Sequence, residues 1–385
     1  MLQIGAGLQI TPNASRLLFE WGLEKVVQEP AAEPTFLAVR RYSDGMVLTM
    51  EKDFNVKMRA KYGAPFIDLH RVDLQKILYD KAMHIGVTVR LGARVVTTFP
   101  ETSEVITESG ENYAGDIIVG ADGLWSRCRE ALLGRKDSPL PTGDLAYRIV
   151  LNLDQITDPE LRDWISKPSC NFWIGPKAHA VGYSVRAGTM YNLVLLCPDD
   201  LPKEVARQAG SVGEMRRLFA HWDPILTRFL DQVDTVDKWK RMYRSPLDSW
   251  TNEEGSFVLI GDSCHPMLPY LAQGVNSSIE DGGVLGRLLA CLESKDQLRH
   301  RVKLYEQLRK ARSEAIVRET FHQRDAFHLP DGPEQQERDR LFASMLGKEI
   351  TCKFPSRWTC VEVQPWLYGY DAYKEADQAL IAGAS

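Results

Sequence analysis

The fold class of this chain is decided by residues 256–289, which read SFVLIGDSCHPMLPYLAQGVNSSIEDGGVLGRLL. The apolar start predicts a buried strand that ends at Gly261. Asp262 then places a carboxylate at the carboxyl edge of a sheet, where ligands bind in open α/β folds. Two prolines stiffen the connection that follows, and Gly274 lets the backbone approach a ligand closely. A helix that begins nearby directs its amide N–H groups to the same place.

These three features of residues 256–289 suit one kind of ligand. A carboxylate, a close backbone and a helix N-terminus fit a hydroxylated chain joined to an electron-poor ring that must hold negative charge. A flavin has this form. The alternative is a capped strand, loop and helix that bind nothing.

The length and composition of the chain are typical of a globular protein. Its 385 residues are too many for one ordinary core, so we expect two domains or one elaborated domain. Hydrophobic residues make up 44% and charged residues 26%, which excludes a disordered or fibrous chain. The net charge of -5 gives no excess of positive charge that would attract nucleic acid. No apolar run approaches the roughly 20 residues that span a bilayer. We therefore expect neither a nucleic-acid partner nor a membrane span.

Cysteine usage favours a reducing compartment. The seven cysteines show no CxxC spacing, and their odd number argues against a zinc site and against a disulfide framework. Cys264 and His265 are consecutive in a loop, so we do not expect them to meet as a nucleophile and base. The first residues lack the basic and long apolar regions of a secretory signal. The sequence predicts a cytoplasmic protein without a metal site.

The order of the predicted elements indicates an α/β domain that a β-rich domain interrupts. An early helix is followed by two strands joined by a turn over residues 36–50, and residues 87–99 pair with residues 104–110. From about residue 142 to residue 246, strand-like pieces come close together, as in one antiparallel sheet. The chain then continues into the strand quoted first, charged helices and an aromatic tail.

Three motifs resemble those of FAD-dependent aromatic-ring monooxygenases in the salicylate hydroxylase-like group. Residues 261–286 are similar to the second flavin-contacting motif of that family. DIIVGADGLWSRCRE at 116–130 is similar to its middle motif, and HRVDLQKIL at 70–78 resembles the helix that carries its flavin-contacting arginine. The similarity runs over nearly all 385 residues.

The resemblance implies a doubly wound FAD-binding domain of the glutathione reductase type, interrupted by a β-sheet-rich substrate domain. Residues 1–143 would form the first part of the FAD-binding domain, and residues 144–246 the substrate domain. Residues 247–346 would form the second part of the FAD-binding domain with the C-terminal helices, and residues 347–385 an aromatic tail.

The resemblance also implies which residues hold FAD. Asp262 would contact the ribityl chain or the phosphates, and Gly274 and Val275 would offer backbone N–H groups near the flavin ring. Arg71 would reach the cofactor, although a surface arginine near a helix start is the alternative. The segment around Gly7 would pass close to the flavin.

Asp122 and Gly123 lie in the middle motif. The resemblance implies that they shape the crevice used by FAD and the nicotinamide donor. A plain turn explains the two residues equally well.

Arg148, Tyr183 and His179 lie on predicted strands of the β-rich domain. Arg148 interrupts an apolar strand, and a phenolate or carboxylate would give its guanidinium a planar anionic partner. His179 and Tyr183 share one face of a strand. The resemblance implies that Arg148 and Tyr183 orient a phenolic substrate and help to ionise it, with His179 in the same pocket. The alternatives are that Tyr183 is a structural tyrosine at the edge of the core and that His179 is a structural histidine whose hydrogen bonds are made within the sheet.

The reaction is also implied by the resemblance. NAD(P)H reduces the flavin, and the reduced flavin takes up O2 to form a C4a-hydroperoxide, which passes OH to an electron-rich carbon of a small aromatic substrate. The protein supplies position, exclusion of water and substrate ionisation, and no metal is required. An epoxidase on the same scaffold is the alternative enzyme.

The N-terminal segment IGAGLQI, residues 4–10, departs from the family pattern. A dinucleotide-binding turn has a third glycine three residues after its second, and here that position is Ile10. The segment resembles instead the flavin-side loop that follows the first unit of the family. The resemblance therefore implies that a first βαβ unit of about 40–50 residues is missing. A truncated, catalytically impaired homologue is then the alternative to a working enzyme.

Overall fold

The structure, a computed structural model, describes residues 6–351 and 353–383. Ile4 and Gly5 of the segment IGAGLQI lie outside the described residues. The chain forms two compact units. Unit 1 comprises Met1–Asp80, Pro141–Arg241 and Phe321–Tyr370, and unit 2 comprises Lys81–Leu140, Met242–Thr320 and Asp371–Ser385.

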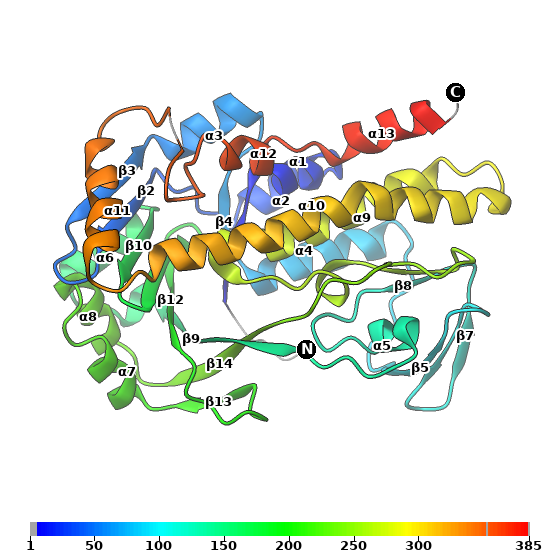
Figure 1. Cartoon of the computed structure of the whole chain (residues 1–385), viewed down its shortest axis with the longest axis horizontal. Coiled ribbons are helices and arrows are strands. Elements are labelled where there is room, and N and C mark those ends of the chain that lie inside the picture. Colours follow the sequence, from blue (N-terminus) through cyan, green and yellow to red (C-terminus); the bar gives the residue numbers. More distant parts are fainter. Residues whose placement is uncertain (1–5, 352, 384–385) are drawn as a thin grey trace. The chain divides into compact units, whose positions relative to one another are not determined.

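Unit 1 is built on an eight-stranded sheet in the order β13-β14-β9-β12-β11-β10-β2-β3 (Figure 1). The antiparallel pairing predicted for residues 142–246 is confirmed for β9, β12, β11 and β10. The predicted hairpin over residues 36–50 is also present, as β2 and β3, and β2 joins β10 in parallel. The strands are β2 (Phe36–Arg41), β3 (Val47–Lys52), β9 (Leu140–Asn152), β10 (Cys170–Gly175), β11 (Ala178–Val185), β12 (Met190–Pro198), β13 (Arg207–Gly210) and β14 (Val236–Tyr243).

One face of this sheet forms the hydrophobic core of unit 1. Alternate residues along a strand point to the same face, so Tyr147 and Ile149 of β9 lie with Tyr191 and Leu193 of β12, all fully or almost fully buried. Three helices cover this face: α6 (Pro159–Ser166), α7 (Val212–Leu218) and α8 (Pro224–Asp231). The residues between them, Arg148 among these, point to the opposite face.

The rest of unit 1 includes a short antiparallel pair, β1 (Gly7–Ile10) with β4 (Ile67–His70). The predicted early helix is present as α1, which begins with a proline directly after Thr11. α4 and α10 contribute residues to both units. The helices are α1 (Pro12–Glu20), α2 (Glu24–Gln28), α3 (Phe54–Tyr62), α4 (Arg71–His84), α10 (Leu298–Phe327), α11 (Pro333–Ser344) and α12 (Val363–Tyr368).

Unit 2 contains the strand and helix predicted from residues 256–289. β15 (Phe257–Leu259) pairs in parallel with β8 (Ile118–Gly120), and α9 (Gln273–Ala290) follows β15. A separate antiparallel sheet has the order β5-β6-β7. Its strands and the remaining helices are β5 (Val95–Phe99), β6 (Glu104–Thr107), β7 (Asn112–Ala114), α5 (Arg127–Leu133) and α13 (Ala372–Gly383). The fold is α/β, as expected, and the loss of a first βαβ unit stays a prediction.

The strand predicted to begin at Val87 is shorter than expected. Only Val95–Phe99 forms a strand, and it pairs with β6. In the part of the chain that the structure describes, residues 87–91 have no strand partner, and Val87, Val89 and Leu91 are 47%, 36% and 66% exposed. An alternating pattern becomes a strand only where a neighbouring strand offers its hydrogen bonds.

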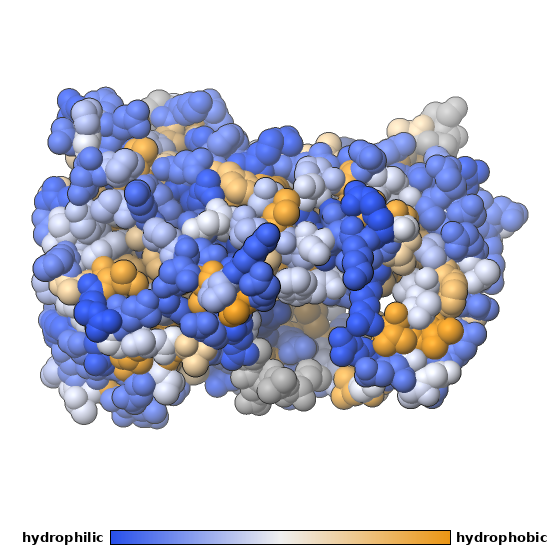
Figure 2. All heavy atoms as spheres, turned by 60° about the horizontal axis from the view of Figure 1, so that its bottom comes forward, coloured by the Kyte–Doolittle hydropathy of each residue, from blue (hydrophilic) through white to orange (hydrophobic). Residues whose placement is uncertain are grey.

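One face of the molecule is mainly polar. Figure 2 shows a face on which hydrophilic residues predominate and hydrophobic residues form small separate groups. Among the described residues, no helix combines the length and the apolar character needed to cross a bilayer.

The packed face of the unit 1 sheet predicts a sensitive glycine. In Gly182→Ala, the new Cβ would lie 2.7 Å from Cζ of Tyr191, a buried ring that stacks on Phe229 with centroids 4.7 Å apart. We expect a loss of about 1–3 kcal/mol in the free energy of unfolding, measured by urea denaturation.

The matched control is Gly213→Ala on α7, where the nearest atom to the new Cβ lies 3.7 Å away. Replacing this helical glycine by alanine should raise the free energy of unfolding by about 0.5–1 kcal/mol. Equal effects of the two substitutions would contradict the packing described for Gly182.

Candidate functional site

The turn after β15 holds Asp262 at the surface of unit 2. Gly261–Ser263 forms a 3-10 turn, in which Gly261 has a φ of 62° and Asp262 is exposed. The Gly261 N–H donates to Oδ2 of Asp281 at 2.8 Å, and Oγ of Ser263 donates to the carbonyl oxygen of Gly120 at 2.7 Å. These bonds fix the turn between the two parallel strands and leave the Asp262 side chain on its outer surface.

The N-terminus of α9 lies a few residues beyond this turn. Its N-cap, Ala272, has a φ of 52°, and no side chain caps the first turn among the described residues. Gly274 and Val275 are partly exposed there, and a Cβ at Gly274 would find only Met267, at 3.8 Å. The uncapped N–H groups and the partial positive charge of the helix end favour an acceptor group of a ligand. This cradle fits the electron-poor ring of a flavin.

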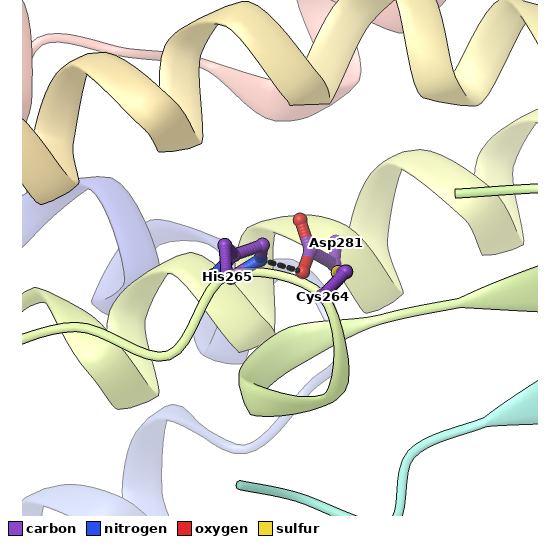
Figure 3. Close-up of side chains that lie close together, drawn as sticks. All are labelled: Cys264, His265 and Asp281. Atoms are coloured by element: carbon purple, nitrogen blue, oxygen red, sulfur yellow. Dashed lines mark hydrogen bonds and ion pairs between the residues drawn. The ribbon is translucent and has the colours of Figure 1, made fainter. Parts of the chain in front are cut away.

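A buried ion-pair network joins the turn to α9 (Figure 3). Asp281 accepts from Nε2 of His265 at 2.6 Å and from Nε of Arg309 at 2.8 Å. Burial disfavours the carboxylate, but His265 and Arg309 lower the pKa of Asp281 to about 2. Glu280 forms a second buried ion pair, 2.6 Å from Nη1 of Arg309. The network therefore fixes α9 and α10 to the turn that carries Asp262.

Cys264 lies close to His265 and Asp281, which corrects the expectation that consecutive loop residues would not meet. Cys264, His265 and Asp281 each have an atom that could bind a metal, and these atoms lie within 4.8 Å of one another. Such a trio resembles a metal-ligand set, but Arg309 and His265 already occupy both Asp281 oxygens. Burial raises the pKa of the Cys264 thiol, so this sulfur is a poor nucleophile. The trio is part of the ion-pair network.

Asp122 organises the turn that follows β8. Its carboxylate accepts from Oγ of Ser126 at 2.5 Å and from the backbone N–H groups of Arg127 and Cys128 at 2.7 and 3.0 Å. Gly123 has a φ of 77°, as a turn glycine requires. These bonds explain both residues as a turn that caps α5.

A pocket of about 720 Å³ adjoins Asp122 within unit 2. Ile118 and Val119 of β8 and Val105 of β6 give it an apolar lining, and Trp125 and Arg127 also border it. Asp122 thus lies both in a structural turn and at the border of a cavity large enough for part of a cofactor.

In unit 1, the sheet register brings the predicted substrate residues to one face. Arg148 lies opposite Val194 of β12, and Val194 lies opposite Val181 of β11. Tyr183 lies opposite Asn192, one step along the same face. Val181 and Val194 are partly exposed, so this part of the face forms an apolar surface beside the Arg148 guanidinium.

Arg148 is a partly buried cation that lacks an acidic partner. Among the described residues, no side chain or backbone group forms a hydrogen bond or ion pair with its guanidinium, whose Cζ lies over the Trp239 ring at 5.1 Å from the centroid. Burial and the nearby Arg71 lower its pKa, while Tyr183 raises it. Burial also raises the pKa of Tyr183 well above its usual range, so this phenol stays protonated and remains a hydrogen-bond donor.

Gly7 packs against this group of residues. Its N–H donates to Oδ1 of Asn192 at 2.7 Å, and a Cβ at Gly7 would lie 2.6 Å from Cε2 of Tyr183. Arg71 is exposed at the start of α4, and its N–H donates to the carbonyl oxygen of Ala6 at 2.9 Å. Unit 1 therefore brings together Gly7, Arg71 and Tyr183, which the sequence placed far apart.

Two further residues of this face were not predicted from the sequence. Asn192 is 1% exposed, and its amide nitrogen has no hydrogen-bond partner in the described part of the chain. A lone asparagine in the apolar strand YNLVLLC was the available signal. Trp239 contacts Arg148, and no sequence signal marks it because the contact joins two strands about 90 residues apart.

His179 lies deeper in the sheet than a pocket residue would. It is 2% exposed, and its Nδ1 lies 2.7 Å from Nε2 of His328. Burial lowers the pKa of both histidines, that of His328 to about 4. This pair agrees with the alternative of a satisfied sheet histidine.

Comparisons with known proteins agree with a flavin site. The family described as FAD binding domain matches residues 7–320. The FAD-dependent monooxygenase OpS4 of Beauveria bassiana (strain ARSEF 2860) is 48% identical over 383 residues, which cover 98% of this chain and 89% of that protein. The 3-hydroxybenzoate 6-hydroxylase of Klebsiella oxytoca is 30% identical over 372 residues, 96% of this chain and 88% of that protein.

Solved structures share the fold at low sequence identity. CtdE in complex with FAD and a substrate has a TM-score of 0.81 at 20% identity, covering 100% of this chain and 90% of that one. A salicylate hydroxylase substrate complex has a TM-score of 0.77 at 19% identity, covering 97% of this chain and 90% of that one. These likenesses establish the fold.

The histidine pair predicts loss of stability in acid. The pKa of an unfolded histidine is near 6.5. In the folded protein, burial and the nearby Arg324 lower the pKa of His328 to about 4, although Asp325 acts in the opposite direction. Between these two pKa values the unfolded chain binds more protons than the folded chain, so the free energy of unfolding falls as the pH drops from about 6.5 toward 4, by up to about 3 kcal/mol.

The measurement is the melting temperature from pH 7 to pH 4.5. His328→Asn should flatten this dependence, whereas the control His300→Asn, at an exposed histidine, should leave it unchanged. A His328→Asn protein with the original slope would show that the pair does not carry the effect.

Proposed function

Because the chain belongs to the FAD-binding family of aromatic monooxygenases, we propose that it hydroxylates a phenolic or benzoate-like ring with O2 and NAD(P)H. The protein is an FAD-dependent monooxygenase of the salicylate and 3-hydroxybenzoate hydroxylase type. In the proposed reaction, a ring C–H, O2, NAD(P)H and a proton give a ring C–OH, water and NAD(P)⁺.

FAD is the cofactor, and the geometry of each unit suggests which residues hold it. In unit 2, we assign the flavin to the uncapped N–H groups of Gly274 and Val275, and the ribityl chain or phosphates to Asp262. In unit 1, the exposed side chain of Arg71 is the assigned contact. The segment around Gly7, whose N–H already donates to Asn192, is proposed to pass close to the flavin. When bound, FAD supplies the activation of O2 that delivers one oxygen atom to the ring.

The observation that carries the substrate class is the guanidinium of Arg148, which forms no hydrogen bond or ion pair with the residues that the structure describes. A partly buried cation without an acid beside it is costly unless a ligand supplies the negative charge. A phenolate or carboxylate would do so, and the partly exposed Val181 and Val194 would contact the ring.

The same contacts define what the protein does to the substrate. Arg148 stabilises the substrate oxyanion and thereby raises the electron density of the ring. Tyr183, which burial keeps protonated, donates a hydrogen bond to the same oxygen. Its ring is held against Gly7, so the phenol is already oriented before the substrate arrives. The 3-hydroxybenzoate 6-hydroxylase of Klebsiella oxytoca, by its name, acts on a ring with both a hydroxyl and a carboxylate.

Arg148→Ala tests the anion site. We expect substrate-stimulated NAD(P)H oxidation to fall by about 100-fold, because the cation assigned to the substrate oxyanion is removed from the developing negative charge. FAD content should stay unchanged. The control is Arg228→Gln, a surface arginine paired with Asp158 and Glu160 on the helical side of unit 1, which should keep full activity. Turnover that survives Arg148→Ala would place the anion site elsewhere.

Asp262→Ala tests the cofactor site. We expect the purified protein to retain less FAD and the apoprotein to bind it at least about tenfold more weakly, because a charge-assisted hydrogen bond is lost. Flavin absorbance and a fluorescence titration measure this. Asp116→Ala, at an exposed aspartate paired with Lys295 in the same unit, is the control. Unchanged FAD affinity would contradict the role of Asp262, and an unaltered protein that takes up no FAD would support the impaired-homologue alternative.

A further inference from the structure

Two guanidinium groups contact the Trp239 ring on β14. Cζ of Arg148 lies 5.1 Å and Cζ of Arg207 lies 4.4 Å from the ring centroid. Arg207, directly opposite Trp239 on β13, is also paired with Asp237 at 2.7 Å. Arg148 has no such acid, so the ring is its one charge-compensating contact among the described residues.

We infer that Trp239 is a positioning residue that holds the Arg148 guanidinium in one plane, so that the site selects substrates carrying a carboxylate. This inference rests on the proposed anion site at Arg148. Trp239 itself is not assigned a contact with the reacting atoms.

The argument follows from the geometry of a guanidinium. Its five N–H donors lie in the plane of the group, whereas an aromatic ring attracts it through its face. In the proposed arrangement, one face of the Arg148 guanidinium lies toward Trp239, which leaves the in-plane N–H groups available to a ligand. A carboxylate accepts two parallel N–H bonds in that plane, but a neutral phenol offers one oxygen.

The contact with Trp239 also offsets part of the cost of burying the Arg148 cation before substrate binds. Burial and Arg71 both act against the cation, and Tyr183 is protonated. The negative face of the indole offsets part of this cost. Without the ring, the guanidinium would turn toward solvent, and the bidentate geometry would have to be restored at each binding event.

The experiment compares two probes on the FAD-loaded protein by calorimetric titration. For Trp239→Leu, we expect the Kd for benzoate to rise about tenfold and the Kd for phenol to change less than about twofold. Trp239→Phe keeps an aromatic face and should bring the benzoate Kd back to within about threefold of the original. Arg207→Gln, which removes the other cation on the ring, should leave both values near those of the unaltered protein.

Equal weakening of benzoate and phenol by Trp239→Leu, or no weakening of either, would overturn the inference. Arg148→Ala separates this failure from failure of the proposed function. If Arg148→Ala weakens benzoate binding and Trp239→Leu does not, the result supports the anion site at Arg148 and contradicts the role of Trp239. If neither variant changes benzoate binding, the result contradicts both. Trp239→Met, closer in volume to tryptophan, replaces Trp239→Leu if the latter does not fold.

Discussion

Burying a charged group is costly unless other groups compensate it, and this constraint separates the structural charges of the protein from the one that we assign to substrate binding. In unit 2, Asp281 is fully buried, yet Arg309, His265 and the Gly261 N–H all bind its carboxylate. That carboxylate therefore holds the turn and helix in place. In unit 1, the partly buried Arg148 contacts the Trp239 ring and, in the part of the chain that the structure describes, pairs with no acid, so we assign its charge to a ligand.

The two neighbouring turns of unit 2 show the same distinction at smaller scale. The Asp122 carboxylate accepts three hydrogen bonds from its own turn and the start of α5. Asp262 is exposed on a turn that the hydrogen bonds of Gly261 and Ser263 hold in place. We assign this exposed carboxylate to the cofactor.

Much of the fold and part of the site could be predicted from local sequence, and the failures have a common cause. The strand and helix at residues 256–289 and the hairpin at residues 36–50 follow from patterns that each segment carries by itself. Residues 87–91 have an equally good strand pattern but lack a partner among the described residues. Asn192 and Trp239 were missed because their roles depend on Gly7 and Arg148, which lie on other strands.

The sequence by itself determined the α/β class and the residue types of the candidate site, because turns, helix starts and apolar periodicity arise from neighbours along the chain. Only the tertiary structure decided which of those residues act together. Strand register places Arg148, Tyr183 and Asn192 on one face, and it buries His179 against His328. Pairing between distant strands is a non-local property. For this reason, the folded structure is needed to tell whether a charged side chain has a partner that compensates it.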